Sequence, residues 1–166
     1  MRKVLIAGGA GFLGSHLCQA FLDKGDQVVC VDNLCTGRLA NMAGLKTKPN
    51  FTFVQCDISQ PLPSGVTDQK YDIIANLASP ASIPSYTRLA LETLLVGSAG
   101  TKNLLDLAQR DGARYVHTST SEVYGEPQVH PQPETYWGNV NSYGGRAMYD
   151  ESKRFAEASG ASKINF

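Results

Sequence analysis

Short apolar runs alternate along this chain with longer segments in which apolar residues recur at helical spacing. The runs occupy residues 3–7, 27–31, 51–55, 72–77 and 113–118, and we expect each to form a strand. The first helix should bury one face, made of Leu13, Leu17, Ala20 and Phe21, and end at Lys24-Gly25. A second helix is predicted over residues 89–109, weakened by Gly97 and Gly100, and a third over residues 146–158.

Strands separated by helices predict parallel βαβ units in a single α/β domain. Right-handed crossovers then give a doubly wound, Rossmann-type sheet with strand order 3-2-1-4-5 over residues 1–158. Residues 126–145 are rich in Pro, Gly, Asn and aromatic residues and read as an ordered loop. Residues 159–166 show no pattern and are expected to be a tail.

Composition narrows the classes of function. The 166 residues carry 15 Lys and Arg against 15 Asp and Glu, so no excess of positive charge favours nucleic acid or an anionic membrane surface. The four cysteines form no C-x-x-C motif and no His pair has zinc-like spacing, so we expect reduced thiols, no metal site and a cytoplasmic protein. Glycines interrupt the uncharged residues 4–22, which argues against a secretory signal, and no stretch is apolar enough to span a membrane.

A glycine motif after the first strand is the sharpest local signal. Gly8, Gly11 and Gly14 give G-x-x-G-x-x-G between a predicted strand and a predicted helix. Such glycines permit the tight turn, the approach of a pyrophosphate and close packing of helix on strand. Asp32 ends the second strand, where a carboxylate can accept both ribose hydroxyls of NAD and repel the 2′-phosphate of NADP, although the nearby Arg38 complicates that preference.

Two later segments predict catalytic chemistry. Tyr149 and Lys153 share one face of the last helix, so the lysine ammonium would favour the tyrosine phenolate as a general base. Thr120 and Glu122 follow the fifth strand, whose carboxyl end borders the ligand crevice in an open α/β sheet. The three histidines suggest no catalytic or metal-binding role.

Motifs spread over residues 2–158 give the chain a family resemblance. They comprise residues 8–16, Asp32-Asn33, 36–38, 77–82, 119–125, 130–141 and 149–154. With these the chain resembles the extended short-chain dehydrogenase/reductase family and, within it, the UDP-glucuronate decarboxylases, which form UDP-xylose. The resemblance extends the expected NAD contacts to Phe12, Leu13, Asn33, Thr36, Gly37, Arg38, Asp57, Ile58, Leu77, Ala78, Ser79, Tyr149 and Lys153.

The resemblance also implies a reaction on a UDP-sugar. Tyr149 would take the proton of the sugar 4-hydroxyl, Lys153 would bind the nicotinamide ribose, and Thr120 would hydrogen-bond the reacting oxygen. The resulting 4-keto sugar acid loses CO2, after which hydride returns and NAD is regenerated. The further substrate contacts implied are Pro80, Tyr86, Ser121, Glu122 and Arg146.

Other functions remain open at this stage. A sugar-nucleotide 4,6-dehydratase would usually carry an acid where Ser121 stands, and a serine is a poor proton donor. A 4-epimerase lacks the pattern of residues 130–141, and a non-catalytic NAD-binding module is a further alternative. A homodimer through the helices at residues 89–109 and 146–158 is also implied by the resemblance.

The chain departs from the family in several places. Gly97 and Asn76 replace a more usual Asn and His, and the family continues for roughly as many residues again. We therefore expect an incomplete domain whose fifth strand leaves an edge unpaired, and catalysis that is absent or severely reduced.

Overall fold

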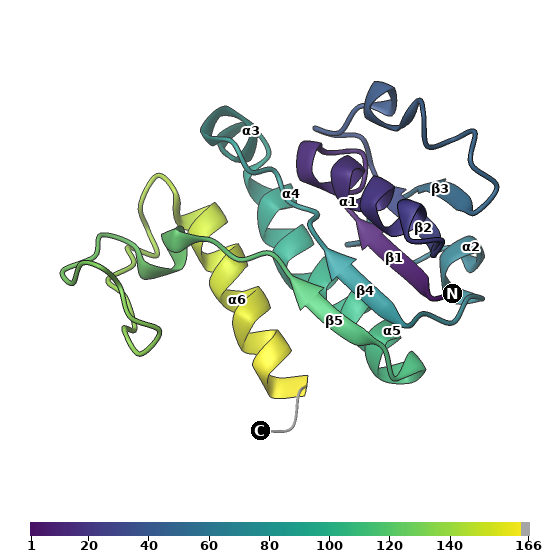
Figure 1. Cartoon of the computed structure of the whole chain (residues 1–166). Coiled ribbons are helices and arrows are strands. Elements are labelled where there is room, and N and C mark those ends of the chain that lie inside the picture. The colour runs from purple at the N-terminus through teal and green to yellow at the C-terminus, as the bar shows by residue number, and fades with distance from the viewer. Residues whose placement is uncertain (164–166) are drawn as a thin grey trace.

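A computed structural model describes residues 1–163 (Figure 1). Its strands are β1 (Lys3–Ala7), β2 (Gln27–Asp32), β3 (Phe51–Gln55), β4 (Ile73–Asn76) and β5 (Arg114–His117). Its α-helices are α1 (Phe12–Asp23), α2 (Ser64–Thr67), α3 (Ile83–Arg88), α4 (Ala90–Leu95), α5 (Thr101–Asp111) and α6 (Ala147–Lys163). Within the described residues there are also two 3-10 turns, η1 (Leu39–Met42) and η3 (Ser121–Tyr124), and the π-helical turn η2 (Val96–Gly100).

The five strands form one parallel sheet with the order β3-β2-β1-β4-β5. This confirms the predicted doubly wound α/β fold and its strand order. Every predicted strand is present, with ends that differ from the predicted ones by no more than one residue. The carboxyl ends of β1, β2 and β4 therefore meet at one edge, where ligands bind in such sheets.

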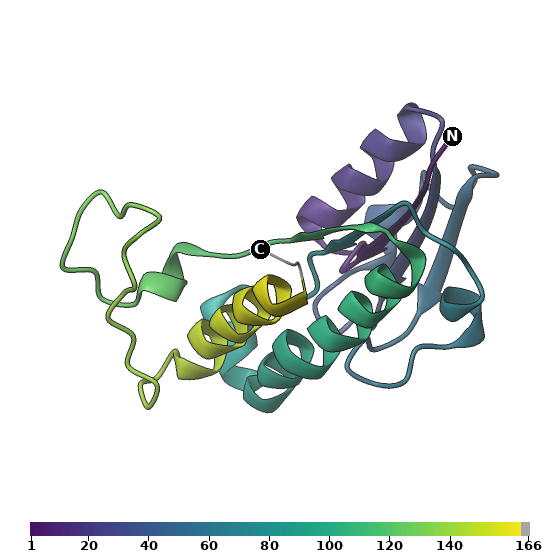
Figure 2. The same cartoon turned by 90° about the horizontal axis from the view of Figure 1, so that it is seen from below.

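Two apolar layers cover the sheet, one on each face. Figure 2 shows α1 on one side and α4, α5 and α6 on the other. Alternate residues of β1 supply both layers: Val4 and Ile6 pack with Cys18 and Leu22 of α1, whereas Leu5 packs on the opposite side. Because β1 is buried on both faces, its unbroken apolar run is physically required.

The buried face of α1 coincides only in part with the predicted one, since Leu17 and Phe21 pack against the core as expected. Leu13 is 64% exposed and Ala20 is exposed, while Gly14, Cys18 and Leu22 face the sheet. Gly14 lies where the helix packs directly on the glycine loop, and a Cβ atom there would lie only 2.7 Å from Gly9 Cα. Only a residue without a side chain fits at this contact, so Gly14 faces inward. That close approach rotates Leu13 outward, against its hydrophobicity.

The helical region before β5 begins earlier and is less regular than predicted. It contains α3, which was not expected, and η2 interrupts it at the two glycines that weakened the sequence prediction. A Cβ atom at Gly97 would lie 2.6 Å from Ser152 Cβ and 2.7 Å from the Ser152 carbonyl oxygen. The missing side chain therefore lets this region pack directly against the backbone of α6.

Helix α6 runs to Lys163, so the predicted end at residue 158 is wrong. Ala158 and Ala161 are strong helix formers, and they outweigh Gly160 between them. The remaining residues of the expected tail, 164–166, lie outside the described part of the chain. The predicted loop at 126–145 carries a bridge between Gly125 and Asn139 and extends away from the sheet in Figure 1.

Candidate functional site

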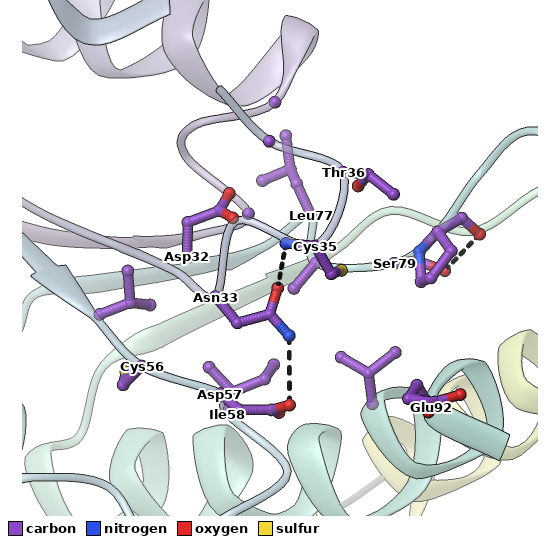
Figure 3. Close-up of a pocket in the computed structure, with 17 residues that line it drawn as sticks. Asp32, Asn33, Cys35, Thr36, Cys56, Asp57, Ile58, Leu77, Ser79 and Glu92 are labelled. Carbon is purple, nitrogen blue, oxygen red and sulfur yellow. Dashed lines mark hydrogen bonds between the residues drawn. The ribbon is translucent and has the colours of Figure 1, made fainter. Parts of the chain in front are cut away.

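A groove opens at the carboxyl ends of the strands, with about 610 Å³ of empty space that includes open solvent (Figure 3). Predicted cofactor contacts and the predicted substrate contact Pro80 form most of its wall. These residues are Gly8, Gly11, Asp32, Asn33, Thr36, Gly37, Asp57, Ile58, Leu77, Ala78, Ser79 and Pro80. Strand ends that are far apart in sequence thus converge on one cavity, as the parallel topology requires.

The glycine loop is held in a conformation that side chains would disrupt. Gly8 has φ +77°, and a Cβ atom there would lie 2.7 Å from the carbonyl carbon of Leu77. Its N–H donates to the Val31 carbonyl (2.8 Å), and the Gly11 N–H donates to the Gly8 carbonyl (3.1 Å). The loop leads into the N-terminus of α1, where free N–H groups and the helix dipole favour an anionic group.

Sulfur atoms form the floor beneath this loop. A Cβ atom at Gly9 would overlap the Cys30 thiol and lie 3.3 Å from the Cys18 sulfur, and Cys30 Sγ donates to Met42 Sδ at 3.4 Å. The hydrogen bond with Cys18 and burial raise the pKa of the Cys30 thiol. The Cys30 thiol is therefore a packing group and not a nucleophile.

The carboxylates at the ends of β2 and β3 shape the other side of the groove. Asp32 accepts hydrogen bonds from the N–H groups of Ala10 (2.9 Å) and Leu34 (2.8 Å). In Figure 3, Asn33 accepts from the backbone N–H of Cys35 and donates to Asp57 at 3.1 Å. Burial raises the pKa of Asp57, but hydrogen bonds from Ser59 and Asn33 outweigh it and the net pKa is lowered.

Some predicted and observed groove residues do not coincide. Four predicted cofactor contacts do not line the groove: Phe12, Leu13, Gly14 and Arg38. Phe12 and Leu13 are 75% and 64% exposed, the Arg38 side chain is also exposed, and Gly14 is buried where the helix packs. Residues that sequence reasoning missed are Val31, Cys35, Cys56, Glu92 and Val96. Val31 and Cys56 could have been found from their positions at strand ends, whereas Glu92 and Val96 come from α4 and η2 and have no sequence signal.

Tyr149 and Lys153 were also expected to contact the cofactor, but they do not line the groove. They lie together in the buried part of α6, 9% and 5% exposed. The lysine Nζ lies 5.8 Å from the centre of the tyrosine ring and donates to the Thr118 carbonyl at 2.8 Å. Burial lowers the pKa of Lys153 to about 8. The Tyr86 ring stacks on Tyr149, with centroids 4.9 Å apart, so it fixes the plane of that ring.

The remaining predicted catalytic and substrate residues gather around η3. Thr120 caps this turn by accepting the Glu122 N–H at 3.3 Å, and Ser121 is exposed. Glu122 pairs with Arg146 at 3.2 Å, and Arg146 also contacts Glu126 at 2.7 Å. The guanidinium group is thus shared by two carboxylates, and a third carboxylate would have to compete with them.

A family model described as GDP-mannose 4,6 dehydratase matches residues 5–162. The chain belongs to this family. Curated relatives include UDP-glucuronic acid decarboxylase 1 of Xenopus tropicalis, 49% identical over 94% of this chain and 36% of that protein. Another is UDP-glucuronic acid decarboxylase 3 of Arabidopsis thaliana, 46% identical over 93% of this chain and 44% of that protein. The chain thus spans less than half the length of these relatives.

Solved structures of related enzymes share the fold. The enzyme WbmH of Bordetella bronchiseptica, in complex with NAD+, is 27% identical with a TM-score of 0.82 over 99% of this chain and 53% of that chain. The dTDP-glucose 4,6-dehydratase DesIV of Streptomyces venezuelae, with NAD bound, is 28% identical with a TM-score of 0.81 over 96% of this chain and 51% of that chain.

Two buried side chains of this GDP-mannose 4,6 dehydratase family member have polar atoms without a hydrogen-bond partner among the described residues. Both imidazole nitrogens of His117 and the Oδ1 atom of Asp150 are buried without a hydrogen-bond partner there. Burial and the Lys153 ammonium lower the pKa of His117 to about 4. Burial and the nearby Glu122 raise the pKa of Asp150, although Arg146 opposes this.

Residues 1–163 contain neither a metal-binding cluster nor a membrane-spanning helix. No group of three or more His, Cys, Asp or Glu side chains in that range could hold a metal ion. No helix in the same range has the length and apolar character needed to cross a bilayer.

Proposed function

We propose that this chain forms the NAD-binding part of a cytoplasmic UDP-glucuronic acid decarboxylase, which converts UDP-glucuronate to UDP-xylose. The observation that carries the proposal is the joint presence of a glycine-lined groove and a buried Tyr149–Lys153 pair in one domain. Decarboxylase relatives with 46–49% identity support this reading over the other reactions of the family.

The residues of the groove fit NAD. Gly8 and Gly11 line the groove without side chains, which suits a pyrophosphate that approaches the backbone, and Gly14 has no room for a Cβ atom because the helix packs there on the Gly8–Gly9 backbone. Asp32 would accept the adenosine ribose hydroxyls with lone pairs that its two backbone hydrogen bonds leave free. When bound, NAD supplies the hydride acceptor that sugar oxidation needs.

The side chains of α6 would handle the proton. Tyr149 would accept it from the sugar 4-hydroxyl, and the Lys153 ammonium would stabilise the phenolate. The Thr118 carbonyl holds Lys153 Nζ in place, and Tyr86 keeps the tyrosine ring from rotating. Oxidation at C4 would turn the glucuronate into a β-keto acid. As CO2 leaves, its bonding electrons would pass into an enolate, which takes up a proton at C5 before the C4 ketone is reduced by the returning hydride.

The η3 region would orient the sugar. Thr120 would hydrogen-bond the oxygen at C4, Ser121 and Glu122 would lie near the carbon that loses CO2, and Arg146 would contact the substrate. The second candidate function, 4,6-dehydration, is supported by the family description and by the DesIV neighbour. It is disfavoured because Ser121 supplies no acid for the loss of water.

Thermal unfolding with added nucleotide tests the cofactor proposal. A ligand that binds only the folded chain raises the midpoint, so we expect an increase with NAD+ and none with the same concentration of NADP+. A cooperative transition that NAD+ does not shift would contradict the proposal. Incubation with UDP-glucuronate and NAD+, analysed for UDP-xylose, tests the reaction; since the decarboxylase relatives are much longer, we expect little turnover by these residues alone.

A homodimer is proposed as well, through α4 and α6. Leu91 is 64% exposed and Phe155 is 51% exposed, and Leu94 and Leu95 are also exposed on α4. Sedimentation at increasing concentration should reveal association of the wild-type chain that Phe155→Glu abolishes. A wild-type chain that stays monomeric at high concentration would contradict this.

A further inference from the structure

A hydrogen-bond path through Asn76 connects the cofactor groove to the buried lysine. Asn76 ends β4 and is 1% exposed. Its Oδ1 atom accepts the N–H of Ala78, a residue of the groove wall, at 3.2 Å. Because a backbone N–H can only donate, this contact fixes the amide oxygen on that side and leaves Nδ2 to donate on the other.

The amide nitrogen of Asn76 is anchored on neighbouring elements. Nδ2 donates to the Tyr115 hydroxyl of β5 at 3.0 Å and to Thr101 Oγ1 of α5 at 3.4 Å. Thr101 is fully buried, so the group that receives this bond has little freedom. The side chain is therefore clamped between the groove wall and the elements behind it.

The backbone of Asn76 completes the path. Its carbonyl oxygen accepts both the N–H and the hydroxyl of Thr118, at 3.1 Å and 3.2 Å. The carbonyl of Thr118 in turn accepts Lys153 Nζ at 2.8 Å. One residue thus fixes Ala78 on the cofactor side and, through Thr118, the position of the lysine.

We propose that Asn76 is a positioning residue that holds the Ala78 wall of the groove in register with Lys153, with Tyr115 as its anchor. This rests on the proposed binding of NAD in the groove. If the Asn76 amide loses its hydrogen bond to Tyr115, the backbone at Ala78 becomes more mobile. Cofactor binding must then order it, and the affinity for NAD falls. A side chain that only filled space in the core would affect stability and leave affinity unchanged.

A pair of tyrosine variants separates these two roles. Tyr115→Phe removes the hydroxyl that anchors Asn76. Tyr71→Phe is a matched control, since the buried Tyr71 hydroxyl makes one hydrogen bond of the same 3.0 Å length, to the Val66 carbonyl, outside the groove. Both variants should lower the unfolding midpoint, but only Tyr115→Phe should weaken NAD+ binding, by about three- to ten-fold in calorimetric titration.

Asn76→Ala removes the clamp entirely and should weaken NAD+ binding by at least about ten-fold, with faster amide hydrogen exchange at Ala78. NAD+ affinities of Tyr115→Phe and Asn76→Ala equal to that of wild type, at a temperature where all are folded, would overturn the inference. If Asn76→Ala does not fold, Tyr115→Phe alone decides. A folded wild-type chain that fails to bind NAD+ would instead overturn the proposed function, so the two failures are distinguishable.

Discussion

Replacing Gly97 by alanine should destabilise the protein, although the same change usually strengthens a helix. The added Cβ atom would lie 2.6 Å from Ser152 Cβ, 2.7 Å from its carbonyl oxygen and 2.9 Å from its Cα atom. Two of these neighbours are backbone atoms, so no change of rotamer relieves the overlap. We therefore expect overpacking to cost about 2–3 kcal/mol, the upper part of the usual range, offset by ~1 kcal/mol of helix propensity. The net loss is then about 1–2 kcal/mol.

A double-mutant cycle tests the cause of this loss. Ser152→Gly removes one of the three close contacts and also the hydrogen bond from Ser152 Oγ to the Tyr149 carbonyl. By itself it should destabilise by about 1 kcal/mol. The double variant Gly97→Ala with Ser152→Gly should be more stable than the sum of the single changes predicts, by about 0.5–1.5 kcal/mol.

The assay is urea unfolding followed by circular dichroism, with Gly160→Ala as the matched control. Gly160 is also a helical glycine, but no heavy atom of the described residues, beyond its chain neighbours and its own helix backbone, would lie within 4 Å of an added Cβ atom. Gly160→Ala should therefore stabilise by about 0.5–1 kcal/mol. The reasoning is refuted if Gly97→Ala is as stable as Gly160→Ala, or if the cycle is additive.

Three further predictions concern the site. Lys153→Met should be more stable than wild type at pH 7 by on the order of 2 kcal/mol, since the wild-type chain holds a buried charge there. That advantage should shrink between pH 8 and 10.5, because in this range the lysine of the folded chain has lost its proton and the lysine of the unfolded chain has not. Urea titrations in which the stabilities of wild type and Lys153→Met stay parallel over this range would contradict this. His117→Phe should stabilise the protein more at pH 4.5 than at pH 8, and the difference in urea unfolding should be on the order of 1–2 kcal/mol. The reason is that between pH 6.5 and 4 the imidazole becomes charged only in the unfolded chain. An equal effect of the substitution at both pH values would argue against this. Gly14→Ala should abolish the NAD+ shift of the unfolding midpoint and lower the midpoint itself, and a retained shift would show that the close approach at this glycine is not needed.

The sheet could be predicted because its strands are buried on both faces. A continuous apolar run such as residues 3–7 has few other interpretations, and the strand order then follows from the handedness of crossovers. The face of α1 could not be read in the same way. Hydrophobicity ranks Leu13 above Gly14 for burial, but the approach of the helix to the loop backbone decides the rotation.

The groove was predictable where strands end and unpredictable where helices cross. Asp32 ends β2 and Ala78 lies just after β4, and the strand order fixes where both residues lie. Val96 reaches the groove from η2, whose register depends on a glycine packed against α6. The ion pairs of Arg146 likewise depend on how a long loop folds back, which residue spacing does not specify.

The sulfur floor under Gly9 has a consequence for how this protein could change over time. The Cys30 thiol lies directly beneath the glycine loop, so a branched side chain at that position would push the loop upward and not merely crowd the interior. Conservative substitutions of these core residues would then change the affinity for the nucleotide more readily than they lower the stability of the fold. A laboratory selection for variants with tighter or looser nucleotide binding should accordingly recover substitutions at Cys30, Cys18 and Met42, none of which lines the groove itself.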